Sequence, residues 1–448
     1  MKVLFISLGC DKNLVDSEHM SGILSKAGYE FTDDEREADV IVINSCCFIN
    51  DAKEESINTI LEMAQYKEQN LKALVVAGCL AERYKDEILK EIPEIDAVLG
   101  TTSYDSIVEA VNSALEENTG EHFEHYESID YLPDNSEVER VVTTGNHMAY
   151  LKIAEGCDKR CSYCIIPKIR GRFRSVPMQE LLNEAKRLAS EGVKELVLVA
   201  QETTLYGKDL TGKKQLPLLL HELCKIEGIE WIRLLYCYPE EITDELIKVI
   251  KTEEKVCNYI DMPIQHSENR ILQRMGRRTS REDLVAVIKK LRKEIPDITI
   301  RTTLITGFPG ESQEDHEGLM NFVEECQFDR LGVFTYSPEE DTLAATFEDQ
   351  IDEEVKEERR DELMSLQQEI SYEHTQQLVG KTIKVMVEGY LFEDDIYVGR
   401  SYMDAPKVDG CVFINSPEEL MTGDFVYVKI TQGREYDVIG EVDYEFTK

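Results

Sequence analysis

The chain has 448 residues, enough for two or three domains, with 50 basic and 89 acidic side chains and a formal net charge of −39. This acidity makes it a poor general binder of free nucleic acid, because such binding depends on Lys and Arg at the phosphates. No apolar run approaches the length of a membrane span. Twelve cysteines in a chain of this size argue for metal binding in a reducing compartment and against a disulfide framework. The first apolar run is typical of a buried strand and not of a signal peptide. We therefore expect a cytoplasmic protein without membrane association.

Residues 1–115 alternate short apolar runs with amphipathic stretches. The apolar runs lie at residues 3–8, 39–43 and 73–77, and the helical patterns at 17–28, 51–66 and 81–92. This rhythm predicts an α/β domain with a doubly wound parallel sheet.

One cysteine follows each of these three predicted strands. Cys10, Cys46 and Cys79 lie just beyond their carboxyl ends, where open α/β sheets bind ligands. A metal site with three thiols at this sheet edge is therefore predicted. The alternative is that the three are small buried residues of the core. Cys47 adds an ambiguity, because adjacent side chains of an extended segment point to opposite faces and only one of the pair is expected to ligate.

Residues 116–146 are polar and acidic and are predicted to form a linker. From 147 to 350 the β-α rhythm returns, with strands predicted at 150–154, 196–200, 231–236, 259–262, 299–305 and 331–334. Six units fall short of a closed eightfold barrel. They predict a partial (β/α)6 barrel with its site at the strand tops.

Cys157, Cys161 and Cys164 follow the first strand of this predicted barrel. Iron–sulfur clusters normally take four cysteines, and the next one, Cys224, lies sixty residues further on. Three local thiols therefore predict a cluster with one iron open to another ligand. A zinc site would require a fourth ligand nearby, and chance is the remaining alternative. The spacing, with Tyr163 before the last cysteine, resembles the signature of radical S-adenosylmethionine enzymes.

Residues 351–379 have the pattern of a charged amphipathic helix that ends at Gly380. Beyond it, residues 380–448 predict a small all-β barrel, with strands at 383–387, 396–399, 411–414, 425–430 and 437–442. From residue 375 to the last residue there are seven basic and fourteen acidic side chains. We therefore do not expect this barrel to bind RNA through a basic face.

With both cysteine triads in place, the chain resembles the methylthiotransferases, a branch of the radical S-adenosylmethionine enzymes, nearly from end to end. The motifs that carry the resemblance are residues 7–18 around Cys10, 44–49 around Cys46, 78–84 around Cys79 and 166–171 after Cys164. It implies two four-iron clusters, one on Cys10, Cys46 and Cys79 and one on Cys157, Cys161 and Cys164. Cys46 takes precedence over Cys47 because it follows Asn44-Ser45. The last barrel then corresponds to a TRAM domain.

Within that family the chain resembles the branch that modifies an aspartate of ribosomal protein twelve of the small subunit. The similarity lies in residues 201–207, 337–342 and 404–410, and tRNA-modifying relatives tend to have a basic residue and proline in place of Glu339 and Glu340. Val176 and Asp341 depart from the usual pattern. The resemblance implies S-adenosylmethionine as methyl donor and radical source, with Tyr163 and Gln201 near it, and no catalytic residue beyond the cluster ligands. It also implies the 30S subunit or its protein as substrate and a flavodoxin- or ferredoxin-type reductant as partner.

Two other functions stay open at this point. One is a tRNA adenosine methylthiotransferase, which a hidden basic face on the last barrel would favour. The other is a non-catalytic iron–sulfur electron carrier or redox sensor. A carrier needs no open iron, so the missing fourth cysteine argues against it.

Overall fold

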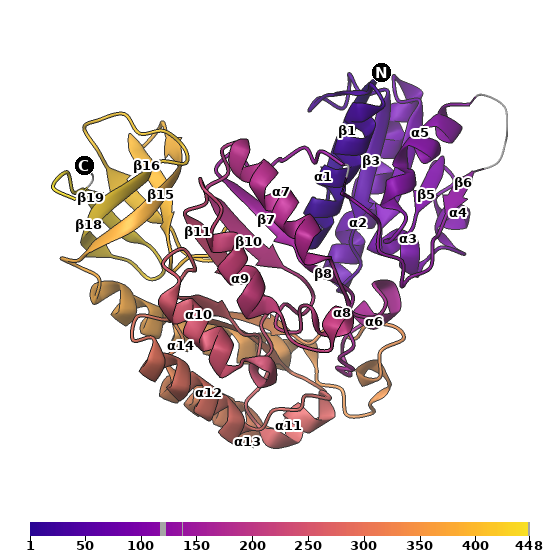
Figure 1. The fold of residues 1–448 in the computed structure, drawn as a ribbon. Helices are drawn as coiled ribbons and strands as arrows, with labels where there is room; N and C mark the ends of the chain where they lie inside the picture. The colour runs from indigo at the N-terminus through magenta and orange to yellow at the C-terminus, as the bar shows by residue number, and fades with distance from the viewer. Residues whose placement is uncertain (117–121, 137, 447–448) are drawn as a thin grey trace.

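The computed structural model describes residues 1–116, 122–136 and 138–446. Part of the predicted 116–146 linker (117–121 and 137) and the last two residues of the predicted C-terminal barrel lie outside the described residues. The N-terminal sheet and the C-terminal barrel lie on either side of a central part built from parallel strands (Figure 1). No helix in the described ranges is long and apolar enough to cross a membrane.

The N-terminal sheet is parallel throughout, as the alternating pattern predicts. Within the described residues its spatial order is β2 (Glu30–Phe31), β1 (Lys2–Ser7), β3 (Val40–Ser45), β4 (Ala73–Gly78), β5 (Ala97–Leu99) and β6 (Phe123–His125). The strand β6 falls inside the segment predicted as a linker. Its three residues, flanked by polar sequence, are too short to give a periodic signal, and they become a strand by pairing with β5.

Helices cover both faces of this sheet. They are α1 (Asp11–Lys26), α2 (Asn50–Ala64), α3 (Cys79–Arg83), α4 (Ile88–Glu91) and α5 (Ile107–Leu115). Alternate residues of one strand enter different cores: Ile41 packs with Ile60 of α2, and Val42 packs with Met20 of α1. The doubly wound sheet is thereby confirmed. The single helix predicted at 81–92 is wrong in detail, because the chain there forms α3 and α4 with a turn between them.

The central part contains the six predicted strands as two parallel triplets. Their orders are β11-β10-β7 and β12-β13-β14. The strands are β7 (Met148–Lys152), β10 (Glu195–Val199), β11 (Trp231–Leu234), β12 (Tyr259–Asp261), β13 (Thr299–Thr306) and β14 (Arg330–Thr335). Backbone hydrogen bonds beyond the regular ladders link the triplets, from Cys257 to Ile232 and from Cys237 to Asp261. The result is an open parallel arrangement with helices outside it.

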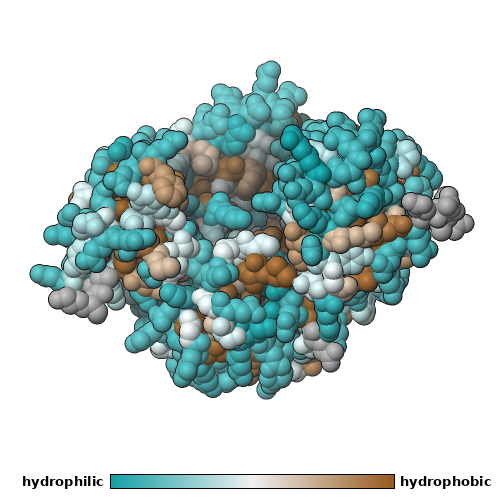
Figure 2. All heavy atoms as spheres, turned by 90° about the horizontal axis from the view of Figure 1, so that it is seen from above, coloured by the Kyte–Doolittle hydropathy of each residue, from teal (hydrophilic) through white to brown (hydrophobic). Residues whose placement is uncertain are grey.

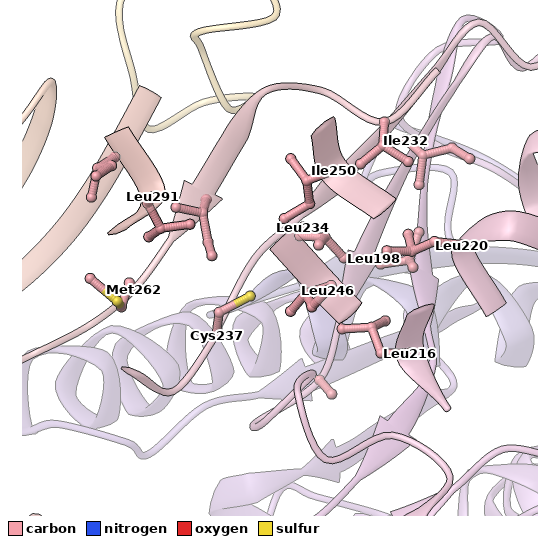
Figure 3. Packing of buried hydrophobic residues seen from close by; sticks show 14 of the residues in the cluster. Leu198, Leu216, Leu220, Ile232, Leu234, Cys237, Leu246, Ile250, Met262 and Leu291 are labelled. Atoms are coloured by element: carbon pink, nitrogen blue, oxygen red, sulfur yellow. The ribbon is translucent and has the colours of Figure 1, made fainter. Parts of the chain in front are cut away.

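The outer helices of the central part bury an apolar core against these strands. The longer ones are α7 (Met178–Ser190), α9 (Leu216–Cys224), α10 (Asp244–Thr252), α12 (Arg281–Glu294) and α13 (Gln313–Cys326). The shorter elements are β8 (Ala154–Glu155), α6 (Ile166–Ile169), β9 (Arg174–Ser175), α8 (Lys208–Thr211) and α11 (Asn269–Arg274). Figure 3 shows Leu216 and Leu220 of α9 and Leu246 and Ile250 of α10 close to Leu198 and Leu234 of the strands.

The C-terminal part begins with the helix α14 (Glu353–Gln376), which matches the charged helical pattern. The predicted helix end at Gly380 is wrong in detail, because α14 ends at Gln376 and residues 377–380 form a turn. Gly380 closes this turn with a left-handed φ of 86°, a conformation that favours glycine. The strands β15 (Thr382–Leu391), β16 (Ile396–Ser401), β17 (Val412–Asn415), β18 (Phe425–Gly433) and β19 (Val438–Val442) form a closed barrel. The predicted fold class is confirmed.

Candidate metal centres

The first triad lies at the carboxyl ends of three adjacent strands. Cys10 follows β1 and is the N-cap residue of α1, Cys46 follows β3, and Cys79 is the first residue of α3 after β4. Because β1, β3 and β4 are neighbours in the sheet, their ends meet at one edge. Burial and the nearby thiols of Cys79 and Cys10 raise the pKa of Cys46 to about 12. The structure thus brings the three predicted cysteines together.

Close backbone packing explains the two glycines before Cys10 and Cys79. Gly9 and Gly78 have φ values of 81° and 92°, which residues other than glycine rarely adopt. A Cβ on Gly9 would lie 2.6 Å from the Cβ of Cys46, and one on Gly78 would lie 2.3 Å from Oδ1 of Asn44. Glycine is needed at both places for the strand ends to approach each other.

Asn13 holds the loops of this triad in place. Its Nδ2 donates hydrogen bonds to the carbonyl oxygens of Leu8, at 3.1 Å, and Ser45, at 3.0 Å. The Asn44 side chain in turn donates to the Asn13 carbonyl at 2.8 Å. These buried bonds join the β1 and β3 loops beside Cys10 and Cys46. Asn13 lies in the motif at residues 7–18, but its sequence position alone does not indicate this role.

Cys46 and Cys47 differ in their surroundings. Cys47 is fully buried and packs within the apolar cluster of Ile43 and Leu80. Burial and Cys79 raise its pKa, and Arg83 opposes that rise. Cys46 lies against Gly9, and the thiols of Cys10 and Cys79 both raise its pKa. These contacts favour Cys46 as the third ligand, and the assignment stays a prediction.

The second triad occupies the loop between β8 and α6. Cys157 and Cys161 are buried and Cys164 is partly buried. Backbone bonds from Cys157 to the Gly171 carbonyl, at 3.1 Å, and from Cys164 to that of Cys161, at 3.1 Å, shape the loop. Burial and the thiol of Cys161 raise the pKa of Cys157 to about 12. The same causes, with Cys157 added, raise the pKa of Cys164.

Three thiols at each site are donors of the kind that iron–sulfur clusters take. Within the residues that the structure describes, no group of three His, Cys, Asp or Glu side chains could hold one metal ion. A four-iron cluster is larger and takes its thiolates from farther apart. In each triad, buried thiols disfavour one another's negative charge, and binding a cationic cluster core in exchange for their protons removes that repulsion.

One buried arginine lies beside a sulfur of each triad. Arg170 Nη2 donates to the Cys79 sulfur at 3.5 Å, and Arg277 Nη1 lies 4.0 Å from the Cys161 sulfur. The Tyr238 hydroxyl is 3.7 Å from that same sulfur. Such cations stabilise thiolates in a dry site. Arg277 and Tyr238 were not predicted, because they lie more than seventy residues from the cysteines in sequence.

A buried ionic network connects the two triads. Arg170 Nη1 donates to Asp16 Oδ2 at 2.9 Å and to Glu155 Oε2 at 3.1 Å. Lys152 pairs with both of these carboxylates. Burial opposes ionisation of Glu155, but Lys152 and Arg170 outweigh it and hold its pKa far below the usual value. Asp16 and Arg170 lie in the sequence motifs at 7–18 and 166–171, and Lys152 is a charge within the apolar run of β7, but no sequence pattern indicated that they pair.

Among the residues that the structure describes, three buried oxygen atoms near the second triad lack a hydrogen-bond partner, although one of them, on Glu202, lies 3.8 Å from Lys159 Nζ. They are Gln201 Oε1, Glu202 Oε2 and Glu240 Oε2. Gln201 Nε2 donates to Glu155 Oε1 at 2.6 Å, which orients the amide. Unpaired buried oxygens are costly and normally mark a missing partner. They fit a ligand with an amino group and hydroxyl groups, such as S-adenosylmethionine.

Tyr163 packs on an aromatic cluster beside the second triad. Its ring contacts Phe308 edge-on with a centroid distance of 6.5 Å, and Phe308 also packs on Tyr336. Its predicted contact with S-adenosylmethionine stays a prediction. The turn at residues 307–310 carries Phe308 and therefore contacts the second cysteine loop through Tyr163.

Comparison with known families divides the chain into three matched parts. Residues 2–100 match a model described as uncharacterized protein family UPF0004, residues 151–323 match the radical SAM superfamily, and residues 379–442 match the TRAM domain. A protein of Lachnoclostridium phytofermentans named ribosomal protein uS12 methylthiotransferase RimO is 61% identical over 444 residues, covering 99% of this chain and 100% of that protein. A protein of the same name from Clostridioides difficile is 50% identical, covering 99% of each.

This chain belongs to the RimO family. The family predicted from the sequence motifs is confirmed, and the names of these RimO relatives favour the ribosomal-protein branch over the tRNA-modifying and electron-carrier alternatives. Because RimO chains carry the radical SAM domain, S-adenosylmethionine and an iron–sulfur cluster are the implied cofactors.

Solved structures agree on the fold. The radical S-adenosylmethionine methyltransferase TsrM from Kitasatospora setae, with cobalamin and a [4Fe-4S] cluster bound, superposes with a TM-score of 0.55 at 14% identity. The match covers 85% of this chain and 78% of that one. At this identity the likeness concerns architecture alone.

Proposed function

We propose that this protein transfers a methylthio group to the β-carbon of an aspartate in ribosomal protein uS12. The observation that carries the proposal is the meeting of two thiol triads from separate domains across one buried network. Two metal sites suit a reaction in which one site activates a C–H bond and the other supplies sulfur. The full-length similarity to proteins named for this reaction supports the choice of substrate.

In this proposal two four-iron clusters are the cofactors. Cys10, Cys46 and Cys79 hold one, and Cys157, Cys161 and Cys164 hold the other. When bound, the cofactors supply one-electron cleavage of S-adenosylmethionine, hydrogen abstraction from the aspartate and a sulfur atom for transfer. A flavodoxin- or ferredoxin-type protein is the proposed electron donor.

The chain's own residues position these groups and exclude water. Gln201 is oriented by Glu155, and its free Oε1 faces the proposed S-adenosylmethionine site with Glu202. Arg170 and Arg277 contribute fixed positive charge beside the sulfurs. None of these side chains has to act as a general acid or base.

The charge of the molecule agrees with a basic protein as substrate. A net charge of −39 attracts cationic partners and repels free nucleic acid. Figure 2 shows a face that is mostly hydrophilic and hollowed near its centre, where hydrophobic residues gather. We therefore propose the 30S subunit or uS12 as partner, which places the reaction in the cytoplasm.

Mass spectrometry of uS12 and of tRNA from a gene-deletion strain tests the substrate. We expect the methylthio mass to disappear from uS12 and to return with the wild-type gene but not with Cys157→Ala. The tRNA profile should stay unchanged throughout. Loss of methylthiolated tRNA with uS12 unaltered would show that the tRNA alternative is the correct one.

A further inference from the structure

Residues 337–344, here called the bridging segment, contact both cysteine loops. They connect β14 to the short helix η4 (Ala344–Thr346) and contain Glu339 and Glu340. The resemblance of this motif to one branch of the family suggests a role in choosing the substrate. In the structure, Glu339 is 2% exposed and points into the protein. Its role must therefore be sought in contacts within the chain.

At one end of the bridging segment, Glu339 binds the N-terminal domain. Its Oε2 accepts a hydrogen bond from Arg83 Nη1 at 2.9 Å, and both side chains are almost fully buried. Arg83 is the last residue of α3, the helix that begins at Cys79. The same guanidinium donates to the Cys47 carbonyl oxygen at 3.0 Å. One carboxylate is thus linked to the backbone beside two strand ends of the first triad.

At the other end, the bridging segment binds the second cysteine loop. The backbone N–H of Ala344 donates to the Ser162 carbonyl at 2.8 Å, and Ser162 lies between Cys161 and Cys164. Thr342 closes the segment into a tight turn, because its N–H and its hydroxyl both donate to the Glu339 carbonyl, at 3.2 and 2.7 Å. The connection between the two anchor points is therefore short and fixed.

The two cysteine loops also meet directly beside the bridging segment. Ile165 is the N-cap residue of α6, and Ile169 is its last residue. Both pack in one apolar cluster with Cys79 and Leu80. Figure 1 shows α6 below α3 on the side of the N-terminal sheet. Apolar contacts alone are non-directional. A buried ion pair with fixed hydrogen bonds also fixes the relative orientation of the two loops.

We propose that the bridging segment sets the distance between the two cysteine triads, with Glu339 and Arg83 as positioning residues. The inference rests on the proposed function, in which sulfur held at one triad meets a carbon activated at the other. A misplacement of about 1 Å in such a reaction costs on the order of 10²-fold in rate. Glu339 touches neither triad, so its effect passes through Arg83 and the backbone.

The test compares Glu339→Gln with Glu340→Gln in the full chain, reconstituted with iron and sulfide. Glu340 is a matched control, because its side chain is 67% exposed and contacts Lys53 and Tyr84 but not Arg83. Its carbonyl oxygen accepts from Arg83 Nη2 at 3.0 Å, and this backbone bond stays in Glu340→Gln. For Glu339→Gln we expect methylthiolated uS12 to fall by on the order of tenfold while 5′-deoxyadenosine release stays within about twofold. The ratio of 5′-deoxyadenosine to methylthiolated uS12 therefore rises. Glu340→Gln should match the wild type.

A second measurement does not depend on turnover or on clusters. Amide hydrogen exchange should become faster in residues 79–84 and 161–166 together for Glu339→Gln, and in neither for Glu340→Gln. If Glu339→Gln does not fold, Arg83→Lys replaces it, since lysine keeps the charge but cannot bridge Glu339 and Cys47. Unchanged exchange and an unchanged product ratio would overturn the inference. If the wild type itself makes no methylthiolated uS12, the proposed function fails, and the exchange data alone decide the inference.

Discussion

At the residue scale, we predict that Cys46 and not the adjacent Cys47 is the third ligand of the first triad. Cys46 lies with Cys10 and Cys79, and Cys47 lies in the apolar core. We expect Cys46→Ala to lower the iron bound after reconstitution from about eight to about four atoms per chain. Cys47→Ala should keep the iron and lose about 1 kcal/mol of unfolding free energy through lost packing. Iron analysis and thermal unfolding measure the two effects.

The opposite pattern of iron loss would assign the ligand to Cys47. Cys224→Ala is a useful control, since that partly buried cysteine lies on α9, away from both triads. It should bind as much iron as the wild type. A loss of all iron in Cys46→Ala would instead mean that the two triads do not fill independently.

At the element scale, one carboxylate joins the C-terminal barrel to the central strands. Glu195 of β10 is fully buried and pairs with Arg400 of β16 at 2.6 Å and with Arg233 of β11 at 2.8 Å. Burial alone would raise the pKa of Glu195, but Arg400 and Arg233 outweigh it and lower the pKa to about 2. The ionised carboxylate therefore stabilises the folded chain.

The lowered pKa of Glu195 sets the direction of a pH dependence. A depressed carboxyl pKa contributes stability above the unfolded value of about 4.5, and this contribution is lost as the pH falls from there towards about 2. At pH 7 we expect Glu195→Gln to lower the unfolding free energy by about 3 kcal/mol, because two buried arginines lose their counter-charge. Denaturant unfolding of both proteins between pH 7 and pH 3 should show the difference shrinking below pH 4.5. A constant difference would mean that packing, not charge, makes Glu195 important.

At the scale of the whole molecule, the net charge of −39 predicts a salt-dependent encounter with the substrate. Association of an acidic enzyme with a basic partner is accelerated by long-range attraction, which salt screens. We expect the association rate with isolated uS12 to fall by about tenfold between low salt and 0.5 M salt. Stopped-flow binding measures this rate. Added free tRNA should not compete, and competition would point to a basic face that the composition hides.

The sequence by itself determined most of the fold and the cysteine triads. Local patterns were sufficient, because strand and helix periodicities and the spacing of Cys157, Cys161 and Cys164 are properties of short segments. The ends of β1, β3 and β4 could also be placed together, since parallel strands share one carboxyl edge. Short elements such as β6 escaped prediction, because pairing with a neighbour and not periodicity creates them.

Only the tertiary structure decided what surrounds and connects the triads. Arg277 and Tyr238 reach Cys161 from remote segments, and Glu339 reaches Arg83 across 256 residues of chain. Side-chain contacts at such separations follow from how the domains pack. No local pattern encodes them, and only the packing of the domains places Glu339 inside the protein.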